Sequence, residues 1–277
     1  MHTPVLLQEV ITGLNIKKNG LYIDATVGEG GHMLEIAKRG GRVLGIDWDN
    51  KQIQNLELRI KNYKDIKLEV GNFCEIESIA KKIGFYPVDG VLFDLGLSMD
   101  QIQKSGRGFS YKKLGEPLDM RIDTSLVMTA AKLLKSLDQN ELYEIFANYS
   151  EEINSLAISQ ALIRARSLRP IEKVADLIKI IDQVVGHKKQ PTYARIFQAL
   201  RIAVNDELEN LKKGLKGALR VLKRQGRIIV ISFHSLEDRI VKQFIRQNQL
   251  RQLNKKIIIA KDGLAFERSA KLRIFKI

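Results

Sequence analysis

Four strand-like segments in the first hundred residues each end on a polar residue, and helix-like segments separate them. The strands are expected at 21–25, 42–46, 67–70 and 88–93, and the polar residues at their ends are Asp24, Asp47, Asn72 and Asp94. Alternating strands and helices predict an α/β fold with a parallel, doubly wound sheet. Because ligands bind such sheets at the carboxyl ends of the strands, four polar ends in phase predict a binding site.

The pattern changes after the fourth strand. An aperiodic stretch with several glycines at 103–123 predicts a long ordered loop, and long loops in compact domains are often functional. From 125 to about 186 the periodic signals are helical. We therefore expect an α/β domain whose first part spans 1–104, a loop and helical insertion at 105–190, and a second part of the α/β domain at 191–277.

The second part is expected to restore the α/β pattern. Apolar residues spaced three or four apart predict one long helix over 197–222, and a buried strand follows at 226–233. The segment from Ser235 to Asp238 resembles a capping box that opens another helix.

The charge of the chain limits the class of partner. There are 46 Lys and Arg residues against 32 Asp and Glu, a net charge of +14. That excess favours a polyanionic partner, with nucleic acid first and an anionic membrane surface second. The alternative is that the charge only keeps the protein soluble. Residues 242–277 hold 10 basic and 2 acidic residues, so this tail is either a phosphate-binding face or merely solvated.

Cysteine usage and hydropathy indicate a cytoplasmic protein. A single cysteine, Cys74, excludes an internal disulfide framework and indicates a reducing compartment. No apolar run approaches the roughly 18–20 residues of a membrane span, and the first residues do not have the pattern of a signal peptide.

The turn after the first strand has the pattern of a cofactor site. Asp24 ends the strand, Gly28 and Gly30 follow in the turn, and Asp47 ends the next strand, where a carboxylate can accept hydrogen bonds from both ribose hydroxyls. A dinucleotide is one candidate, but Met33 stands where its fingerprint needs a third small residue. S-adenosylmethionine is the other, since it needs no phosphate cradle and Asp24 is placed to bind its ammonium group.

Several longer blocks resemble the bacterial RsmH (MraW) family of ribosomal RNA methyltransferases over nearly the whole chain. The blocks are His2–Leu7, Asp24–His32, Gly45–Asp49, Asp94–Ser98, Arg107–Ser110, Pro117–Arg121, Phe197–Ile202 with Val204 and Asn205, and Ile231–Arg239. The resemblance implies a class I S-adenosylmethionine-dependent methyltransferase, a Rossmann-like sheet with an inserted all-helical domain for substrate recognition. It also implies methylation of N4 of a cytidine in the decoding region of 16S ribosomal RNA, with the small ribosomal subunit as partner.

The resemblance assigns cofactor residues position by position. Gly30, Gly31 and His32 would line the methionine end, beside Asp24 and Gly28. Asp47 would hold the ribose, Phe73 would flank the adenine, and Asp94 and Gln101 would complete the pocket. The chain departs from the family after Ser98, where Met99 and Asp100 replace a serine and a proline, so no hydroxyl is available at 99.

The acceptor amine of cytosine is a poor nucleophile, so the enzyme must position it and accept hydrogen bonds from its protons. Asp94, assisted by Ser98, is the expected catalytic group, and the alternative is that Asp94 only binds cofactor. The candidate substrate residues are Arg107, Phe109, Asp119, Arg121, Asn205 and His234. A structural His234 beside a helix cap is the alternative for that residue, and methyl transfer requires no metal.

Two other functions remain open at this point. A nicotinamide-dependent oxidoreductase would use the same sheet, but the chain lacks an obvious histidine–acid pair for hydride transfer. A non-catalytic RNA-binding or assembly factor would keep the fold and bind cofactor without turnover. The cofactor fold and the preference for a polyanion have support from the residues themselves, whereas the methylated position rests on the resemblance.

Overall fold

The computed structural model describes residues 4–187, 189–254, 257–260 and 267–277. The start of the first family block (residues 1–3) and two parts of the basic tail (255–256 and 261–266) lie outside the described residues. The chain forms two compact units, one made of Met1–Leu97 with Leu208–Ile277 and the other of Ser98–Glu207.

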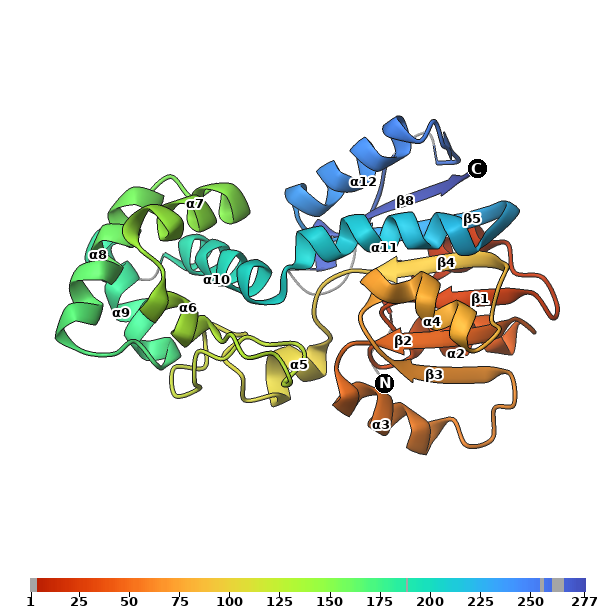
Figure 1. Cartoon of the computed structure of the whole chain (residues 1–277), viewed down its shortest axis with the longest axis horizontal. Coiled ribbons are helices and arrows are strands. Elements are labelled where there is room, and N and C mark those ends of the chain that lie inside the picture. The colour runs from red at the N-terminus through yellow and green to blue at the C-terminus, as the bar shows by residue number, and fades with distance from the viewer. Residues whose placement is uncertain (1–3, 188, 255–256, 261–266) are drawn as a thin grey trace. The chain divides into compact units, whose positions relative to one another are not determined.

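A mixed sheet runs through the first unit in the order β3-β2-β1-β4-β5-β8-β6, with β7 paired to β8 (Figure 1). The strands are β1 Leu21–Asp24, β2 Arg42–Asp47, β3 Ile66–Val70, β4 Val88–Asp94, β5 Leu222–Ser232, β6 Arg251–Gln252, β7 Ile258–Ile259 and β8 Lys271–Lys276. Strands β1 to β5 are parallel, as the alternation predicts, and β8 runs antiparallel to β5. The order reverses between β1 and β4, which is the switch point where ligands bind in such sheets.

Helices cover both faces of this sheet. One face carries α4 (Ile76–Lys82), α11 (Glu207–Val221) and α12 (Ser235–Gln247), and the other carries α1 (Leu7–Leu14), α2 (Gly31–Lys38) and α3 (Asn50–Arg59). Successive strand residues divide between the two layers, so that Ile23 packs in the first and Tyr22 in the second. Burial on both faces explains why these strands read as nearly continuous apolar runs.

The second unit is helical, as the periodicity over 125–186 predicts. Its helices are α5 Met99–Lys104, α6 Ala130–Ser136, α7 Gln139–Ser150, α8 Ser155–Leu168, α9 Val174–Val185 and α10 Gln190–Asn205. Helices α6 to α10 share one apolar core that includes Phe146, Leu162, Ile181 and Leu200. None of the helices in the described parts of the chain is both long and apolar enough to cross a membrane.

The predicted single helix over 197–222 is wrong. Helix α10 ends at Asn205, Asp206 takes a left-handed conformation with φ of 50°, and α11 starts at Glu207. Aspartate tolerates this conformation better than most residues. The break also coincides with the boundary between the units, so the helical unit spans 98–207 where 105–190 was expected.

The C-terminal segment is not a solvated tail in its described parts. Strand β8 pairs with β5 and buries Leu272 and Phe275 in the two cores. Arg273 is 5% exposed and forms a bidentate ion pair with Asp238 of α12, at 2.7 Å from Nε to Oδ1. This arginine is therefore occupied and is not available to a phosphate.

Two glycines in the loop of the second unit allow a matched test of its packing. Gly106 and Gly108 both have positive φ, of 70° and 73°, but a Cβ on Gly106 would meet nothing whereas one on Gly108 would lie 2.2 Å from the Pro117 carbonyl oxygen. Gly106→Ala is therefore expected to lower the free energy of unfolding by about 1–2 kcal/mol. Gly108→Ala should lower it by clearly more and expose the loop to protease. Equal losses for the two variants in urea unfolding would contradict this packing.

Candidate cofactor and substrate site

The turn between β1 and α2 is shaped by its glycines. Gly30 caps α2 with φ of 81°, and a Cβ there would lie 2.6 Å from the Leu56 side chain. The backbone N–H of Gly28 donates to Oδ2 of Asp47 at 2.8 Å, which ties this turn to the end of β2. Gly31 follows as the first helical residue, and a Cβ on it would meet Pro4 at 2.2 Å. These glycines therefore allow the turn to pack closely against its own unit.

Strand register places three carboxylates at one edge of the sheet. Asp24 pairs with Gly45 of β2 and with Leu92 of β4. Asp47 and Asp94 each lie two residues beyond those partners, at the carboxyl ends of β2 and β4. Because Asp24 and Asp94 end the two strands at the switch point, the acids flank the crevice where a ligand is expected.

The buried His32 and the half-buried Asp94 form a close pair at this edge. Nε2 of His32 lies 3.4 Å from Oδ2 of Asp94, and His32 is 4% exposed. The Thr26 hydroxyl oxygen accepts a 2.7 Å hydrogen bond from the Asp94 N–H, which fixes the end of β4. Nδ1 of His32 and Oδ1 of Asp94 are buried and have no hydrogen-bond partner among the residues that the structure describes. Buried polar atoms are normally paired, so these two atoms fit a polar ligand.

Burial and mutual charge shift the pKa values of this group. Burial raises the pKa of Asp24 to about 7, an effect that the nearby His32 partly offsets. Burial also raises the pKa of Asp47 to about 6, and the hydrogen bonds that its carboxylate accepts from backbone N–H groups partly offset this rise. Burial lowers the pKa of His32, but its contact with Asp94 and the charge of Asp24 outweigh this, so the net shift is upward. Such a concentration of perturbed groups is typical of functional sites.

Phe73 lies just past the end of β3. Asn72 caps a short 3-10 helix, Phe73–Glu75, by accepting a hydrogen bond from the Cys74 N–H at 2.9 Å. The Phe73 ring packs edge-on against Phe93, with ring centroids 5.8 Å apart. Phe73 as a whole is half-buried, and its ring also lies close to Gly214 of α11.

Ser98 and Gln101 belong to the second unit and cap α5 together. The Ser98 hydroxyl accepts from the Gln101 N–H at 3.2 Å, and the Gln101 side chain accepts from the Ser98 N–H at 2.9 Å. Both side chains therefore stabilise the start of α5. The sequence analysis did not predict this role, although the spacing of Ser98 and Gln101 is that of a capping box.

Four of the predicted substrate residues hold the 105–129 loop together. Arg107 donates to the carbonyls of Arg121 and Ile122, and Arg121 forms a bidentate pair with Asp119 at 2.7 and 2.8 Å. The Asn205 amide, which is 1% exposed, donates to the Met120 carbonyl and accepts from the Ile122 N–H. These contacts make the loop an ordered part of the helical unit.

Phe109 and His234, the other predicted substrate residues, lie in different units. The Arg107 guanidinium lies 5.4 Å from the centroid of the Phe109 ring in the helical unit. His234 caps α12 in the first unit, where it forms a capping box with Glu237. The expected box at Ser235–Asp238 is therefore displaced by one residue, because a histidine occupies the cap in place of the usual serine.

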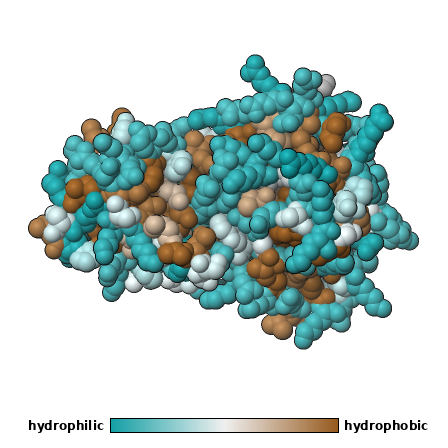
Figure 2. Space-filling model, viewed as in Figure 1, coloured by the Kyte–Doolittle hydropathy of each residue, from teal (hydrophilic) through white to brown (hydrophobic). Residues whose placement is uncertain are grey.

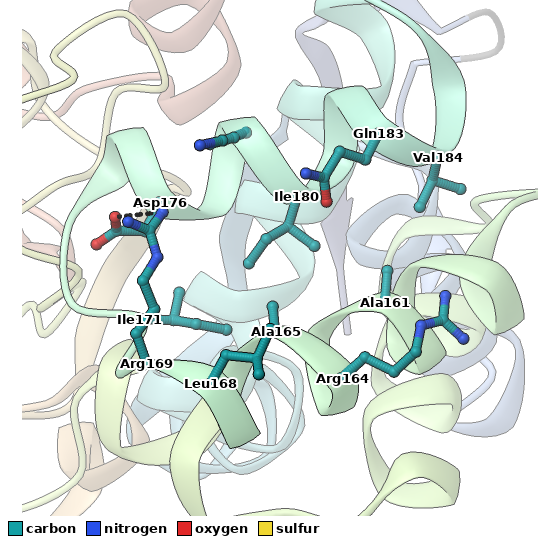
Figure 3. Close-up of a pocket in the computed structure, with 11 residues that line it drawn as sticks. Ala161, Arg164, Ala165, Leu168, Arg169, Ile171, Asp176, Ile180, Gln183 and Val184 are labelled. Carbon is teal, nitrogen blue, oxygen red and sulfur yellow. Dashed lines mark ion pairs between the residues drawn. The ribbon is translucent and has the colours of Figure 1, made fainter.

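A separate hollow of about 320 Å³ opens between α8 and α9 (Figure 3). Its floor is apolar, with Ala161, Ala165, Ile171 and Ile180, and cationic side chains stand around it, among them Arg164 and Arg169. None of the predicted site residues lines it.

One residue of the main site was not predicted from the sequence. This residue is Thr26, which accepts from the Asp94 N–H and lies inside the Asp24–His32 block, so its position in that block was the available signal.

Comparisons with known proteins show which family the sequence is similar to. The profile of the MraW methylase family matches residues 1–276. Ribosomal RNA small subunit methyltransferase H of Thermomicrobium roseum is 44% identical over 252 residues, which cover 89% of this chain and 77% of that protein. The protein of the same name from Dictyoglomus thermophilum is 38% identical over 292 residues, with 99% and 96% covered. A solved rRNA methylase from Streptococcus thermophilus is 8% identical, with a TM-score of 0.47 and 100% and 98% covered.

Proposed function

The chain belongs to the MraW methylase family, and on that premise we propose that it transfers a methyl group from S-adenosylmethionine to 16S ribosomal RNA. The acceptor in this proposal is N4 of a cytidine in the decoding region, and the enzyme acts in the cytoplasm. The observation that carries the proposal is the His32–Asp94 pair, whose unpaired buried atoms lie at the switch point of the sheet.

The residues around the switch point fit S-adenosylmethionine. The Asp47 carboxylate suits the ribose hydroxyls, and the half-buried Phe73 just past the end of β3 suits the adenine ring. Asp24 supplies an acid for the ammonium group, beside the turn that contains Gly28, Gly30 and Gly31. When bound, the cofactor supplies an electrophilic methyl group on a sulfonium centre.

Asp94 then acts on the acceptor amine. The lone pair of this amine is delocalised into the cytosine ring, so alignment and hydrogen bonding of its protons supply much of the rate. Oδ1 of Asp94 is buried and unpaired among the described residues, and it can accept a hydrogen bond from the amine. The Thr26 hydroxyl keeps the end of β4 in place during the transfer.

The helical unit supplies the substrate loop in this proposal. Arg107, Asp119, Arg121 and Asn205 order the loop through the contacts described above, and Phe109 offers a ring for stacking on an unpaired base. Ser98, at the start of α5, assists at the acceptor, and Gln101 supports the same turn. Since a base edge must be reached, the target nucleotide is single-stranded or flipped.

Cofactor affinity should rise with pH because Asp24 must be ionised to bind an ammonium group. Its pKa of about 7 in the free protein means that binding releases a proton below that pH. We expect the dissociation constant to fall about fivefold between pH 6 and pH 7, and about twofold more by pH 8, where it levels off. Three neighbouring charged groups also act on the pKa of Asp24: His32 lowers it, and Asp94 and Asp47 raise it.

Calorimetry in buffers of different ionisation enthalpy measures this proton release. Asp24→Asn should weaken binding and remove most of the pH dependence above pH 6.5, whereas His32→Gln should retain most of it. A proton count of zero at pH 6.5 for the unaltered protein would show that Asp24 is already ionised and would contradict this account.

A transfer assay tests the function itself. Tritiated S-adenosylmethionine is supplied with small ribosomal subunits or large subunits from cells that lack the enzyme. Label should enter the small-subunit RNA and not the large-subunit RNA. Label in the large subunit, or in neither, would contradict the proposed acceptor.

A further inference from the structure

Almost all the net positive charge lies in the last quarter of the chain. Residues 208–277 contain 18 Lys and Arg against 5 Asp and Glu, which accounts for +13 of the +14. The helical unit at 98–207 contains 16 basic and 14 acidic residues and is close to neutral. The strongest attraction for a polyanion is therefore expected in the C-terminal part of the first unit.

Seven of the fifteen described cations of this part lie on two helices that cover the same face of the sheet (Figure 1). The apolar sides of α11 and α12 pack into one core, through Leu211 and Leu215 and through Val241 and Phe244. Their opposite sides are exposed, and a hydrophilic band follows α11 in Figure 2. We call the exposed cations the α11–α12 basic face, namely Lys212, Lys213, Lys216, Arg220, Arg239, Lys242 and Arg246.

Acidic side chains neutralise part of this face. Lys212 pairs with Glu209, Arg220 with Glu77 and Lys242 with Asp238. Lys213, Lys216 and Arg246 have no ion-pair or hydrogen-bond partner for their side chains in the part of the chain that the structure describes. One carboxylate, that of Glu209, interacts electrostatically with Lys212, Lys213 and Lys216. The face therefore keeps an excess of positive charge that favours an external anion.

We propose that the α11–α12 basic face binds the phosphate backbone of the acceptor RNA, away from the nucleotide that is methylated. This inference rests on the proposed function for the identity of the polyanion. The large apolar side chains that are exposed among the described residues all lie outside α11 and α12, whereas a membrane-binding helix needs apolar side chains to insert. The face has no aromatic side chains for stacking, so its contacts are with phosphates and are independent of base sequence.

Salt-dependent RNA binding by the full chain tests this inference. The face variant carries Lys213→Gln, Lys216→Gln and Arg246→Gln. A matched control removes three exposed cations from the helical unit with Lys135→Gln, Arg164→Gln and Lys179→Gln. Fluorescence anisotropy with a labelled decoding-region RNA fragment gives the dissociation constant at several KCl concentrations.

The face variant should bind the RNA about 10- to 100-fold more weakly at 0.1 M salt, with a slope of log affinity against log salt that is shallower by about 2. Its KM for RNA should rise, while kcat and the affinity for S-adenosylmethionine stay unchanged, and the control should resemble the unaltered protein. Unchanged RNA binding by the face variant, or an equal loss in the control, would overturn the inference.

Two further outcomes separate this inference from related ones. Loss of binding to vesicles of anionic phospholipid with RNA affinity retained would assign the face to a membrane surface and would overturn the inference. If the unaltered protein binds RNA through this face but transfers no methyl group to it, the proposed function fails while the face remains an RNA-binding surface.

Discussion

Asp94→Ala is expected to lower the rate of methyl transfer by about 10²–10⁴-fold. The Thr26 hydroxyl accepts from the Asp94 N–H and fixes the backbone at the end of β4, His32 contacts the carboxylate, and its Oδ1 is buried without a partner among the described residues. Removing it takes away the acceptor for the amine protons and leaves His32 without its counter-charge. Single-turnover rates with saturating cofactor measure the effect.

Asp94→Asn separates chemistry from cofactor binding. The amide keeps the size of the side chain and an oxygen but loses the charge. If Asp94 acts on the amine, kcat falls and the calorimetric affinity for S-adenosylmethionine changes little. If it only binds cofactor, the affinity falls and kcat at saturation is retained, which would contradict the catalytic role.

Asp89→Asn is the matched control for this test. Asp89 lies at the opposite end of β4, where Lys17 and Lys223 pair with it and hold its pKa below its usual value. We expect nearly unaltered transfer in this variant.

Arg273→Met is expected to lower the free energy of unfolding by about 3–5 kcal/mol. The change leaves the Asp238 carboxylate buried, 4% exposed, without its bidentate partner. Lys242 also contacts Asp238 at 3.5 Å, but its ammonium is largely exposed and cannot supply the same paired hydrogen bonds. Urea unfolding of the full chain measures the loss.

The double variant Asp238→Leu with Arg273→Met tests the cause of that loss. Replacing both partners by apolar side chains of similar size removes the buried charge, so most of the lost stability should return. A single variant that loses less than about 1 kcal/mol, or a double variant as unstable as the single one, would show that the pair is not what holds β8 to α12.

Local patterns predict the parallel strands and the helical insertion well because each depends on short-range periodicity. The break at Asp206 escapes prediction because the apolar stripe continues on both sides of it, and only the Asn205–Asp206 pair hints at a turn. Strand β8 escapes because its lysines and arginine read as a basic tail. Its burial depends on Asp238, which lies 35 positions earlier in the chain.

The site could be predicted in part for the same reason. Asp24, Asp47 and Asp94 come to one edge because parallel strands align their carboxyl ends, a consequence of topology that alternation reveals. The loop contacts of Asn205 join positions about 85 residues apart, so no local pattern shows that its amide is already used. The sequence did not reveal that His234 is itself the N-cap of α12, because histidine is an uncommon cap residue.

Identification of the methylated nucleoside tests the central claim most directly. Small ribosomal subunits from cells that lack the enzyme are incubated with the protein and tritiated S-adenosylmethionine, and the RNA is digested to nucleosides and separated. The label should be recovered as N4-methylcytidine and should be lost with Asp94→Ala. Label in any other nucleoside, or no label although calorimetry shows that the cofactor binds, would contradict that claim.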